Sequence, residues 1–239
     1  MGRAGCGGTG DDGGRRGRAR EGAGGQTGGM REGRDGGRGG RRGGLLRVHA
    51  VAAAWGAAEA SAFFIVPDVW LSRVVLRDPP RAYRAALSAL GGALAGGLAL
   101  RAWVRRAGPE TSARALRRLP AISGAMIEKV DEEVREKGLG ALVLGPGRGV
   151  PYKIYVRAAA LEGAAPAELA AWSIPGRLPR FLAVTGLAHG LLVLARRALP
   201  AGVADRIAPA VHAAAWTAFY AWYFANVGRE APRRGPANP

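Results

Sequence analysis

Residues 85–104 read AALSALGGALAGGLALRAWV, and Arg101 is the only charged residue among them. Apolar or small side chains occupy every face of a helix built from this stretch, which is typical of a helix in lipid or in a large core. Its length is close to the roughly 20 residues that a helix needs to cross a bilayer. The stretch therefore predicts a long apolar helix surrounded by lipid or by protein.

Three further apolar stretches occur, namely VHAVAAAWGAAEASAFFIV at 48–66, FLAVTGLAHGLLVLA at 181–195 and IAPAVHAAAWTAFYAWYFA at 207–225. Because alanine-rich segments are only weakly hydrophobic, a soluble helical bundle is the alternative to a membrane protein. Four helices that are apolar on all sides, however, leave too few amphipathic helices in 45–227 to cover them. The last stretch also ends in an aromatic cluster before Arg229, as membrane interfaces favour. The aromatic residues are Trp216, Phe219, Tyr220, Trp222, Tyr223 and Phe224.

We therefore predict an all-α integral membrane protein, multi-pass in the plasma membrane, with several transmembrane helices. Gly92-Ala-Leu-Ala-Gly96 and Gly186-Leu-Ala-His-Gly190 both have the G-x-x-x-G spacing. In lipid this spacing lets two helix backbones approach closely. Chance is the competing explanation in a chain that contains 39 glycines.

The two ends of the chain differ from its middle in composition. Residues 1–44 contain 20 glycines, ten arginines and five acidic residues, so they cannot bury a core and are predicted to be a disordered tail. Such a segment can contact RNA or anionic lipid, but a solvated extension, or a start codon placed too early, is the interpretation that we favour. We expect no signal peptide there. Residues 45–227 form the predicted membrane domain, and 228–239 form a second disordered tail.

Motifs for catalysis and cofactor binding are missing from the sequence. The only cysteine is Cys6, and His49, His189 and His212 lack metal-ligand spacing. The stretch GPGRGVPYKIY at 145–155 suggests a phosphate-binding loop, but the Gly-Lys-Ser/Thr ending of that motif is absent. We therefore expect no metal, no other cofactor and no enzymatic activity.

Charged residues interrupt the apolar sequence at two places. At the first, Glu59 and Asp68 flank a segment in which Pro67 interrupts helical hydrogen bonding. Arginines lie before and after this segment. The chain is therefore predicted to enter the membrane, bend near Pro67 and leave on the same side, which makes a re-entrant helical hairpin.

The second interruption is the stretch GPGRGVPYKIY itself. Its apolar arms, 139–144 and 152–161, are too short for two full crossings, so we predict a second re-entrant hairpin that turns at Gly147 and Pro151. Non-helical backbone at membrane depth survives only where protein or water satisfies it. The two hairpins are therefore expected to face each other or a shared cavity.

An ionised side chain within a bilayer is costly and is usually paired or functional. Glu59 and Asp68 are predicted to be acids that respond to protons or ions. Four cations are predicted to bind an anionic head group, and they are Arg148, Lys153, Arg177 and Arg180. The alternative is that all these groups pair structurally or lie at the membrane interface.

Residues 105–137 are more polar and are predicted to form one or two surface helices. Within them, MIEKVDEEVREK at 126–137 mixes charges at helical spacing. Such a mixture is typical of a solvated helix face.

Several features of the chain follow one another in a recognisable order. They are Glu59, Pro67-Asp68, the glycines at 91–97, Gly147-Arg148, Pro151-Tyr152-Lys153 and Arg177 to Phe181. In order and spacing, this set resembles the DedA superfamily, also called the SNARE-associated or VTT-domain family, and most closely its YqaA-like branch. The resemblance covers about residues 48–195.

The resemblance implies an all-helical membrane protein with two inward-pointing re-entrant hairpins. Members of the family are associated with moving polyprenyl-phosphate carriers or phospholipids across bilayers and with dependence on the proton-motive force. Glu59 and Asp68 match the family's acidic pair, while Arg148 and Lys153 compete for its basic position. The chain departs from the family at Leu98-Ala99-Leu100, where an aromatic residue is usual. The substrate is therefore left open.

The leading hypothesis is a lipid transporter or scramblase whose partners are membrane lipids and, in a homo-oligomer, further copies of the chain. The alternative is a non-transporting membrane scaffold involved in envelope maintenance, which would lose its activity on deletion of residues 1–44. A nucleic-acid-binding protein is suggested only by the net charge of +17. It would have to stay soluble without detergent, so we expect no nucleic-acid partner.

Overall fold

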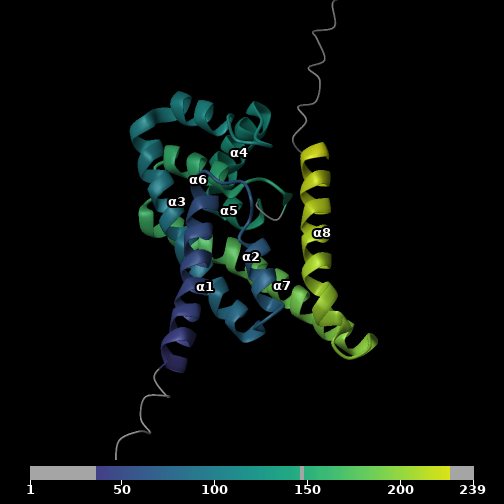
Figure 1. Ribbon diagram of the computed structural model, residues 1–239. Helices are drawn as coiled ribbons and strands as arrows, with labels where there is room; N and C mark the ends of the chain where they lie inside the picture. Colours follow the sequence, from purple (N-terminus) through teal and green to yellow (C-terminus); the bar gives the residue numbers. More distant parts are fainter. Residues whose placement is uncertain (1–35, 146–147, 227–239) are drawn as a thin grey trace, which may run out of the picture. The chain divides into compact units, whose positions relative to one another are not determined.

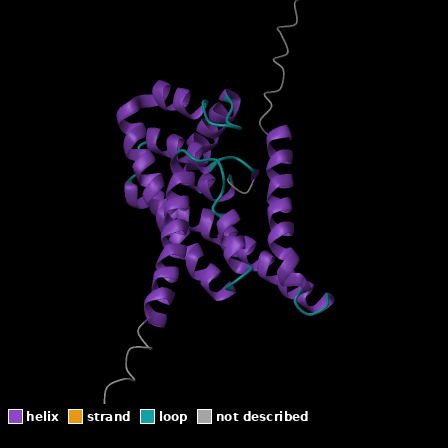
Figure 2. Cartoon of the chain, viewed as in Figure 1, coloured by secondary structure: helices purple, strands orange, loops and turns teal. Residues whose placement is uncertain are grey.

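The structure is a computed structural model that describes residues 36–145 and 148–226, with side chains from Leu46 onward. Helices are the only regular elements in these residues, which contain no strand (Figure 2). The all-α prediction is confirmed for this part of the chain. The predictions for residues 1–35, for the tail at 228–239 and for a turn at Gly147 lie outside the described residues.

The helices are labelled in Figure 1. In chain order they are α1 (Gly36–Ser61), α2 (Asp68–Val75), α3 (Pro79–Leu116), α4 (Gly124–Lys137), the 3₁₀ turn η1 (Gly138–Gly140), α5 (Ala141–Leu144), α6 (Tyr152–Leu161), α7 (Pro166–Ala198) and α8 (Val203–Asn226). The chain divides into two units, Met1–Gly40 and Arg41–Pro239, and the contacts described below all belong to the second.

The first helix starts earlier than the composition predicted. α1 begins at Gly36, inside the segment 1–44 that was assigned to a disordered tail. A segment of this composition cannot form a packed domain. It can still continue a helix whose later residues pack against the rest of the protein.

Three of the four apolar stretches lie wholly in helices, namely in α3, α7 and α8. The fourth lies in α1 as far as Ser61, and its last residues, 62–66, belong to the loop before α2. Within the described residues, α3 and α7 are long and apolar enough to cross a membrane. The two differ in how much protein covers them, because 44% of the most apolar window of α3 is buried but only 17% of that of α7.

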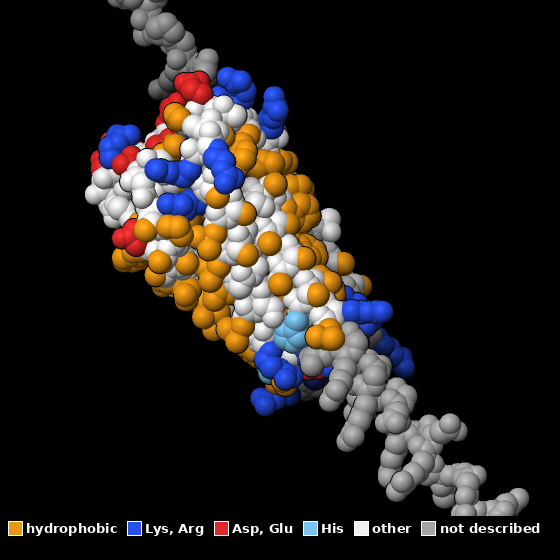
Figure 3. Space-filling view, turned by 90° about the vertical axis from the view of Figure 1, so that its left-hand side faces the viewer, with side chains coloured by type: hydrophobic (Ala, Val, Ile, Leu, Met, Phe, Trp, Pro, Cys, Tyr) orange, Lys and Arg blue, Asp and Glu red, His pale blue; other side chains and the backbone are white. Residues whose placement is uncertain are grey.

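The exposed surface of α7 is strongly apolar. Leu187, Leu191 and Leu194 follow one another at helical spacing, and their exposed fractions are 64%, 57% and 62%. Figure 3 shows a face of the molecule on which Lys and Arg side chains gather at the upper and lower ends, with hydrophobic side chains and no charged ones in the band between. An apolar surface of this kind marks contact with lipid or with another protein.

The first G-x-x-x-G motif brings two helices together. A Cβ added at Gly92 would overlap the backbone oxygen of Ala53 in α1, and one added at Gly96 would overlap that of Ala57. α1 and α3 therefore touch backbone to backbone, as this spacing allows. The second motif makes no such approach, because a Cβ at Gly190 would meet nothing within 4 Å among the described residues.

We expect Gly92→Ala to lower the free energy of unfolding by about 1–3 kcal/mol, since the added methyl group forces the backbones of α1 and α3 apart. Gly91→Ala is the matched control, because a Cβ at Gly91 meets open space. Alanine is the better helix former by about 1 kcal/mol, so this control is expected to keep or gain stability. Unfolding by sodium dodecyl sulfate in mixed micelles measures both, and equal values for the two variants would contradict the close packing.

The polar segment 105–137 forms two helical pieces, as predicted. α3 continues to Leu116 but breaks at Gly108, whose φ of 77° is left-handed and which Pro109 follows. α4 begins after Ser123, whose side chain accepts a hydrogen bond from Met126 N at 3.2 Å. Its buried positions, Ile127, Val130 and Val134, follow the helical period and face α6.

α6 lies at the centre of the larger core. Every residue from Tyr152 to Ala160 is buried. α3, α4 and α5 pack around it. Two charged residues, Lys153 and Arg157, are therefore held in the interior by a short helix that is otherwise apolar or aromatic.

Candidate functional site

Two interruptions between helices bring backbone and charge together. α1 ends at Ser61 and α2 begins at Asp68, while α5 ends at Leu144 and α6 begins at Tyr152. These breaks lie where the two hairpins were predicted. Pro67 directly precedes α2 and Pro151 directly precedes α6. Proline suits the start of a helix because the N–H groups there have no partner within the helix.

The first predicted acid, Glu59, forms an ion pair with Arg177 of α7. Both side chains are almost fully buried, with exposed fractions of 5% and 3%. The Arg177 guanidinium also lies over the ring of Tyr152, 4.3 Å from its centroid. Tyr152 in turn is hydrogen-bonded through its hydroxyl to Ser173 Oγ at 2.5 Å. The arginine is therefore held between a carboxylate and an aromatic face, both of which favour its charge.

The second predicted acid, Asp68, pairs with Arg180 of α7. Arg180 Nε donates to Asp68 Oδ2 at 2.9 Å, and a terminal nitrogen of the same guanidinium donates to the same oxygen. Arg177 and Arg180 are three residues apart and so share one face of α7. This face of α7 thus presents two cations to two carboxylates, and Arg180 keeps about a third of its side chain exposed.

Lys153, at the start of α6, connects the break before α6 with the break between α1 and α2 through a hydrogen bond. Its Nζ donates to the carbonyl oxygen of Phe63, which lies between α1 and α2, at 3.0 Å. In the same loop, Val66 N–H donates to the hydroxyl of Tyr220 on α8 at 2.8 Å. Protein side chains thus satisfy backbone groups that a helix would have paired. The five charged groups of this region, here called the buried charge cluster, are Glu59, Asp68, Lys153, Arg177 and Arg180.

Two atoms of the cluster have no hydrogen-bond partner among the described residues. They are Asp68 Oδ1 and Arg177 Nε, and both are buried. Buried polar atoms in folded proteins almost always have a partner. One acceptor and one donor are therefore available in the cluster to a water molecule or to a polar ligand.

Arg148 is placed apart from these groups. Its side chain is 51% exposed, and it donates to Glu133 Oε1 of α4 at 3.0 Å. Glu133 is itself buried and accepts from Tyr155 Oη at 3.0 Å. Of the predicted head-group ligands, the structure brings three into the buried charge cluster, and they are Lys153, Arg177 and Arg180.

The surroundings of Glu133 keep it ionised. Burial raises the pKa of Glu133, but the hydrogen bond from Tyr155 and the positive charges of Arg148 and Lys137 outweigh it, so the pKa lies below its ordinary value of 4.5. A carboxyl group whose pKa falls on folding stabilises the folded state above its unfolded pKa and loses that effect as the pH drops through the folded pKa. The contacts of α4 with Arg148 and Tyr155 are therefore intact at neutral pH.

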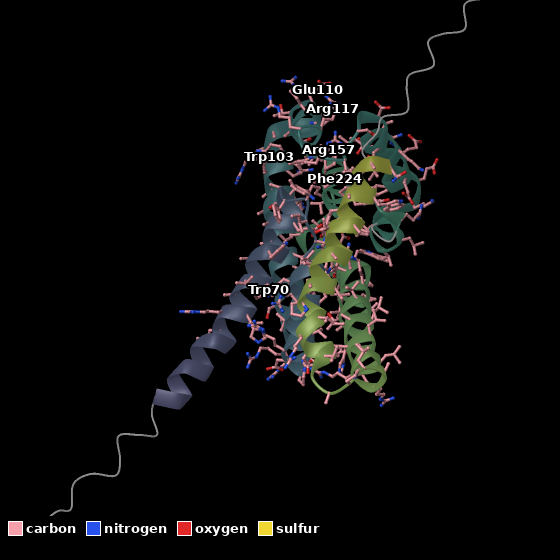
Figure 4. The ribbon with its side chains drawn as sticks, turned by 45° about the vertical axis from the view of Figure 1, so that its right-hand side comes forward. Trp70, Trp103, Glu110, Arg117, Arg157 and Phe224 are labelled. Atoms are coloured by element: carbon pink, nitrogen blue, oxygen red, sulfur yellow. The ribbon has the colours of Figure 1, made fainter. Side chains whose placement is uncertain are left out.

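A second buried arginine, Arg157, was missed by the sequence analysis. It donates from one terminal nitrogen to both carboxylate oxygens of Asp131 at 2.7 Å, from Nε to Ser112 Oγ at 3.0 Å and from the other terminal nitrogen to Pro109 O at 3.1 Å. In the view of Figure 4 it lies inside the helices, below Glu110 and Arg117.

The interpretation of 126–137 as a solvated helix face is therefore wrong for Asp131 and Glu133. These two side chains turn towards α6, where Arg157 and Tyr155 bind them. The available signal was an arginine in the middle of the apolar run YKIYVRAAAL, because a cation in such a run needs a partner. Sequence spacing alone did not identify that partner.

The described residues thus form a helical protein with two helices long enough to cross a membrane and a buried cluster of charged groups. Comparison of the chain with protein-family models, with curated proteins and with solved structures finds no match. The resemblance to the DedA superfamily accordingly rests on the residues quoted for it.

Proposed function

We propose that the protein is a multi-pass membrane protein that moves anionic lipids, such as phospholipids or polyprenyl phosphates, between the two leaflets. The observation that carries the proposal is the buried charge cluster. It holds two carboxylate–arginine pairs and a lysine, and it retains one acceptor and one donor without partners in the described residues. Buried charge of this kind inside a membrane protein usually serves a ligand or an ion.

The apolar character of the exposed surface supports a location of the helices in a bilayer. The most apolar window of α7 is only 17% buried, and its large leucines point outward. On the face in Figure 3, the cations lie at the two ends and an apolar band separates them. Lys and Arg near helix ends extend to the polar interface of a bilayer, while the hydrocarbon core favours apolar side chains.

The two carboxylate–arginine pairs also suggest how binding of a lipid head group to an arginine is coupled to binding of a proton to its carboxylate. A phosphate has the charge and geometry to replace a carboxylate on an arginine. When a proton neutralises Asp68, its attraction for Arg180 weakens, and the guanidinium becomes available to a phosphate. Arg180 is the partly exposed member of its pair, so a head group reaches it before it reaches Arg177. Lipid binding would then be accompanied by proton uptake.

The resemblance to the DedA superfamily agrees with this proposal. Its acidic pair corresponds to Glu59 and Asp68, which are the two carboxylates of the cluster. The basic position of the family was assigned either to Arg148 or to Lys153. Of the two, Lys153 lies in the cluster and is buried, so we assign the basic position to Lys153.

The test is lipid movement in liposomes that contain the purified full-length protein and a fluorescent phosphatidylglycerol. Added dithionite bleaches only the outer leaflet, so the rate of further bleaching reports movement. Asp68→Asn with Arg180→Gln removes both charges of one pair and keeps polar groups in place. We expect this variant to move lipid at least about tenfold more slowly, because a charge-assisted hydrogen bond to the head group contributes about 1.5–3 kcal/mol.

The matched control is the exposed ion pair between Arg196 and Asp205, which lies at the turn between α7 and α8. Arg196→Gln with Asp205→Asn makes the same chemical change outside the cluster and is expected to leave the rate unchanged. Equal rates in the two double variants would refute the site. A wild-type rate no higher than that of protein-free liposomes would refute lipid movement altogether.

A further inference from the structure

Two adjoining cavities form a groove along α2. The first has a volume of about 340 Å³ and is lined mainly by α1, α2 and α8, with Trp55, Trp70 and Trp216 among its walls. The second, of about 250 Å³, lies towards the turn between α2 and α3. Trp70 and Arg73 line both cavities, so the two adjoin at these side chains. None of the five residues of the buried charge cluster lines either one.

The first cavity presents apolar ring surface. The Trp70 indole N–H donates to Val48 O at 3.3 Å, and that of Trp216 donates to Ser72 Oγ at 3.0 Å. Because protein atoms accept these hydrogen bonds, the two indoles have no polar group left for a ligand. Figure 4 shows Trp70 in the lower part of the bundle. Arg73, His212 and Thr217 also line this cavity, and the ring faces between them suit a hydrocarbon chain.

The second cavity presents positive charge. Arg73 of α2, Arg77 in the turn that follows and Arg81 of α3 line it, and Asp78 is the only acidic residue among the described residues of its lining. Asp78 is already engaged, since one of its oxygens accepts from Arg81 N at 3.0 Å and the other lies 3.1 Å from Arg81 Nε. Arg81 Nε is nevertheless buried without a hydrogen bond in the described residues. Arg73 and Arg77 form no ion pair among these residues.

From this arrangement we infer that the groove is a binding site for an anionic phospholipid, separate from the buried charge cluster. Its phosphate binds Arg73, Arg77 and Arg81, and one acyl chain lies against the three tryptophans. Arginines bind phosphate bidentately, and an aromatic-lined cavity beside them is the complement of a head group joined to a hydrocarbon chain. The chain's own segment 1–44 has the wrong charge for this groove, with ten arginines against five acidic residues.

The inference rests on the proposed membrane location but not on lipid movement. A lipid held here is bound at the surface of α2 and α8, and it links α8 to the rest of the helices. The site therefore predicts a preference for anionic lipid that persists in a protein unable to move lipid.

Brominated acyl chains quench tryptophan fluorescence at short range and give a direct readout. The chain has six tryptophans, and replacing Trp103, Trp172 and Trp222 with phenylalanine leaves only those of the groove. This variant in nanodiscs of phosphatidylcholine is titrated with brominated phosphatidylglycerol or with brominated phosphatidylcholine. We expect phosphatidylglycerol to quench at a lower mole fraction, and unbrominated phosphatidylglycerol to reverse the quenching.

Arg73→Gln with Arg77→Gln on the same background is expected to reduce the preference for phosphatidylglycerol about 30-fold, at about 1 kcal/mol for each arginine near the membrane surface. Arg114→Gln with Arg117→Gln changes two exposed arginines outside the groove and is expected to keep the preference. Equal quenching by both lipids, or an unchanged preference in the Arg73 and Arg77 variant, would overturn the site.

Two further measurements distinguish lipid binding from binding of a free phosphate ester, and the groove from the buried charge cluster. Reversal of quenching by glycerol 3-phosphate alone would mean that the groove binds free phosphate esters rather than lipid, and would overturn the lipid assignment. The Asp68→Asn, Arg180→Gln change on the same background is expected to keep the preference for phosphatidylglycerol. If neither the wild type nor any variant moves lipid while this preference persists, the proposed function is wrong but the assignment of the groove as a lipid-binding site stands.

Discussion

Replacing Arg177 with methionine is expected to lower the free energy of unfolding by about 3–5 kcal/mol, because it leaves the Glu59 carboxylate buried without its partner. Both side chains lie almost wholly inside the protein. Methionine keeps much of the arginine stem's volume, so the loss of charge dominates the effect. The measurement is equilibrium unfolding of the full chain by sodium dodecyl sulfate in mixed micelles, followed by tryptophan fluorescence.

A second change distinguishes charge from packing at this pair. Glu59→Gln together with Arg177→Met removes both charges, and we expect it to recover most of the lost stability, since a buried pair replaced as a whole is often nearly neutral. Arg196→Gln breaks the exposed pair with Asp205 and is expected to cost less than about 1 kcal/mol. If the double variant were as unstable as Arg177→Met alone, the stacking of Arg177 on Tyr152 would explain the loss and the charge argument would fail.

Arg157→Met is expected to cost about 2–4 kcal/mol, because the arginine links α6 to α4 and to the break in α3. Its removal leaves Asp131 without its cation and removes donors to Ser112 Oγ and Pro109 O. Asp131 retains some contact with solvent, which keeps the expected cost below that at Arg177. The same unfolding experiment measures it.

Arg157→Lys is the informative companion of this variant. Lysine keeps the charge but lacks the planar fork that reaches three acceptors, so we expect an intermediate loss. Arg135→Gln breaks the exposed pair with Glu132 on α4 and is expected to change stability by less than about 0.5 kcal/mol. A loss at Arg157→Met no larger than that at Arg135→Gln would show that the buried link does not hold α4 in place.

Local patterns predicted the helices and their interruptions well. The apolar runs at 85–104, 181–195 and 207–225 lie in helices and that at 48–66 is helical as far as Ser61, while Pro67 lies at the end of the break that follows. These features depend on residues that are neighbours in the chain. Whether a stretch can be helical, and where proline or glycine interrupts it, is decided within a few residues.

Charge partners were predicted less well. Glu59, Asp68, Arg177 and Arg180 were all identified as candidate site residues, but their pairing was not. Arg148 resembled Lys153 in the sequence, yet it pairs with Glu133 near the surface while Lys153 is buried. Asp131 resembled a solvated residue and is bound by Arg157. A rotation of the helix by about half a turn separates a buried charge from an exposed one, and local spacing does not define that rotation.

The sequence alone determined that this protein is helical, apolar along much of its length, and charged at a few positions within its apolar segments. The tertiary structure decided which charges meet, because Glu59 near the end of α1 and Arg177 of α7 are 118 residues apart and come together only in the packed protein. The close contact of Gly92 with Ala53 was likewise decided by packing, since Gly190 has the same local spacing and an open surface. Local residues determine secondary structure, whereas the free energy of burying several helices at once selects their partners.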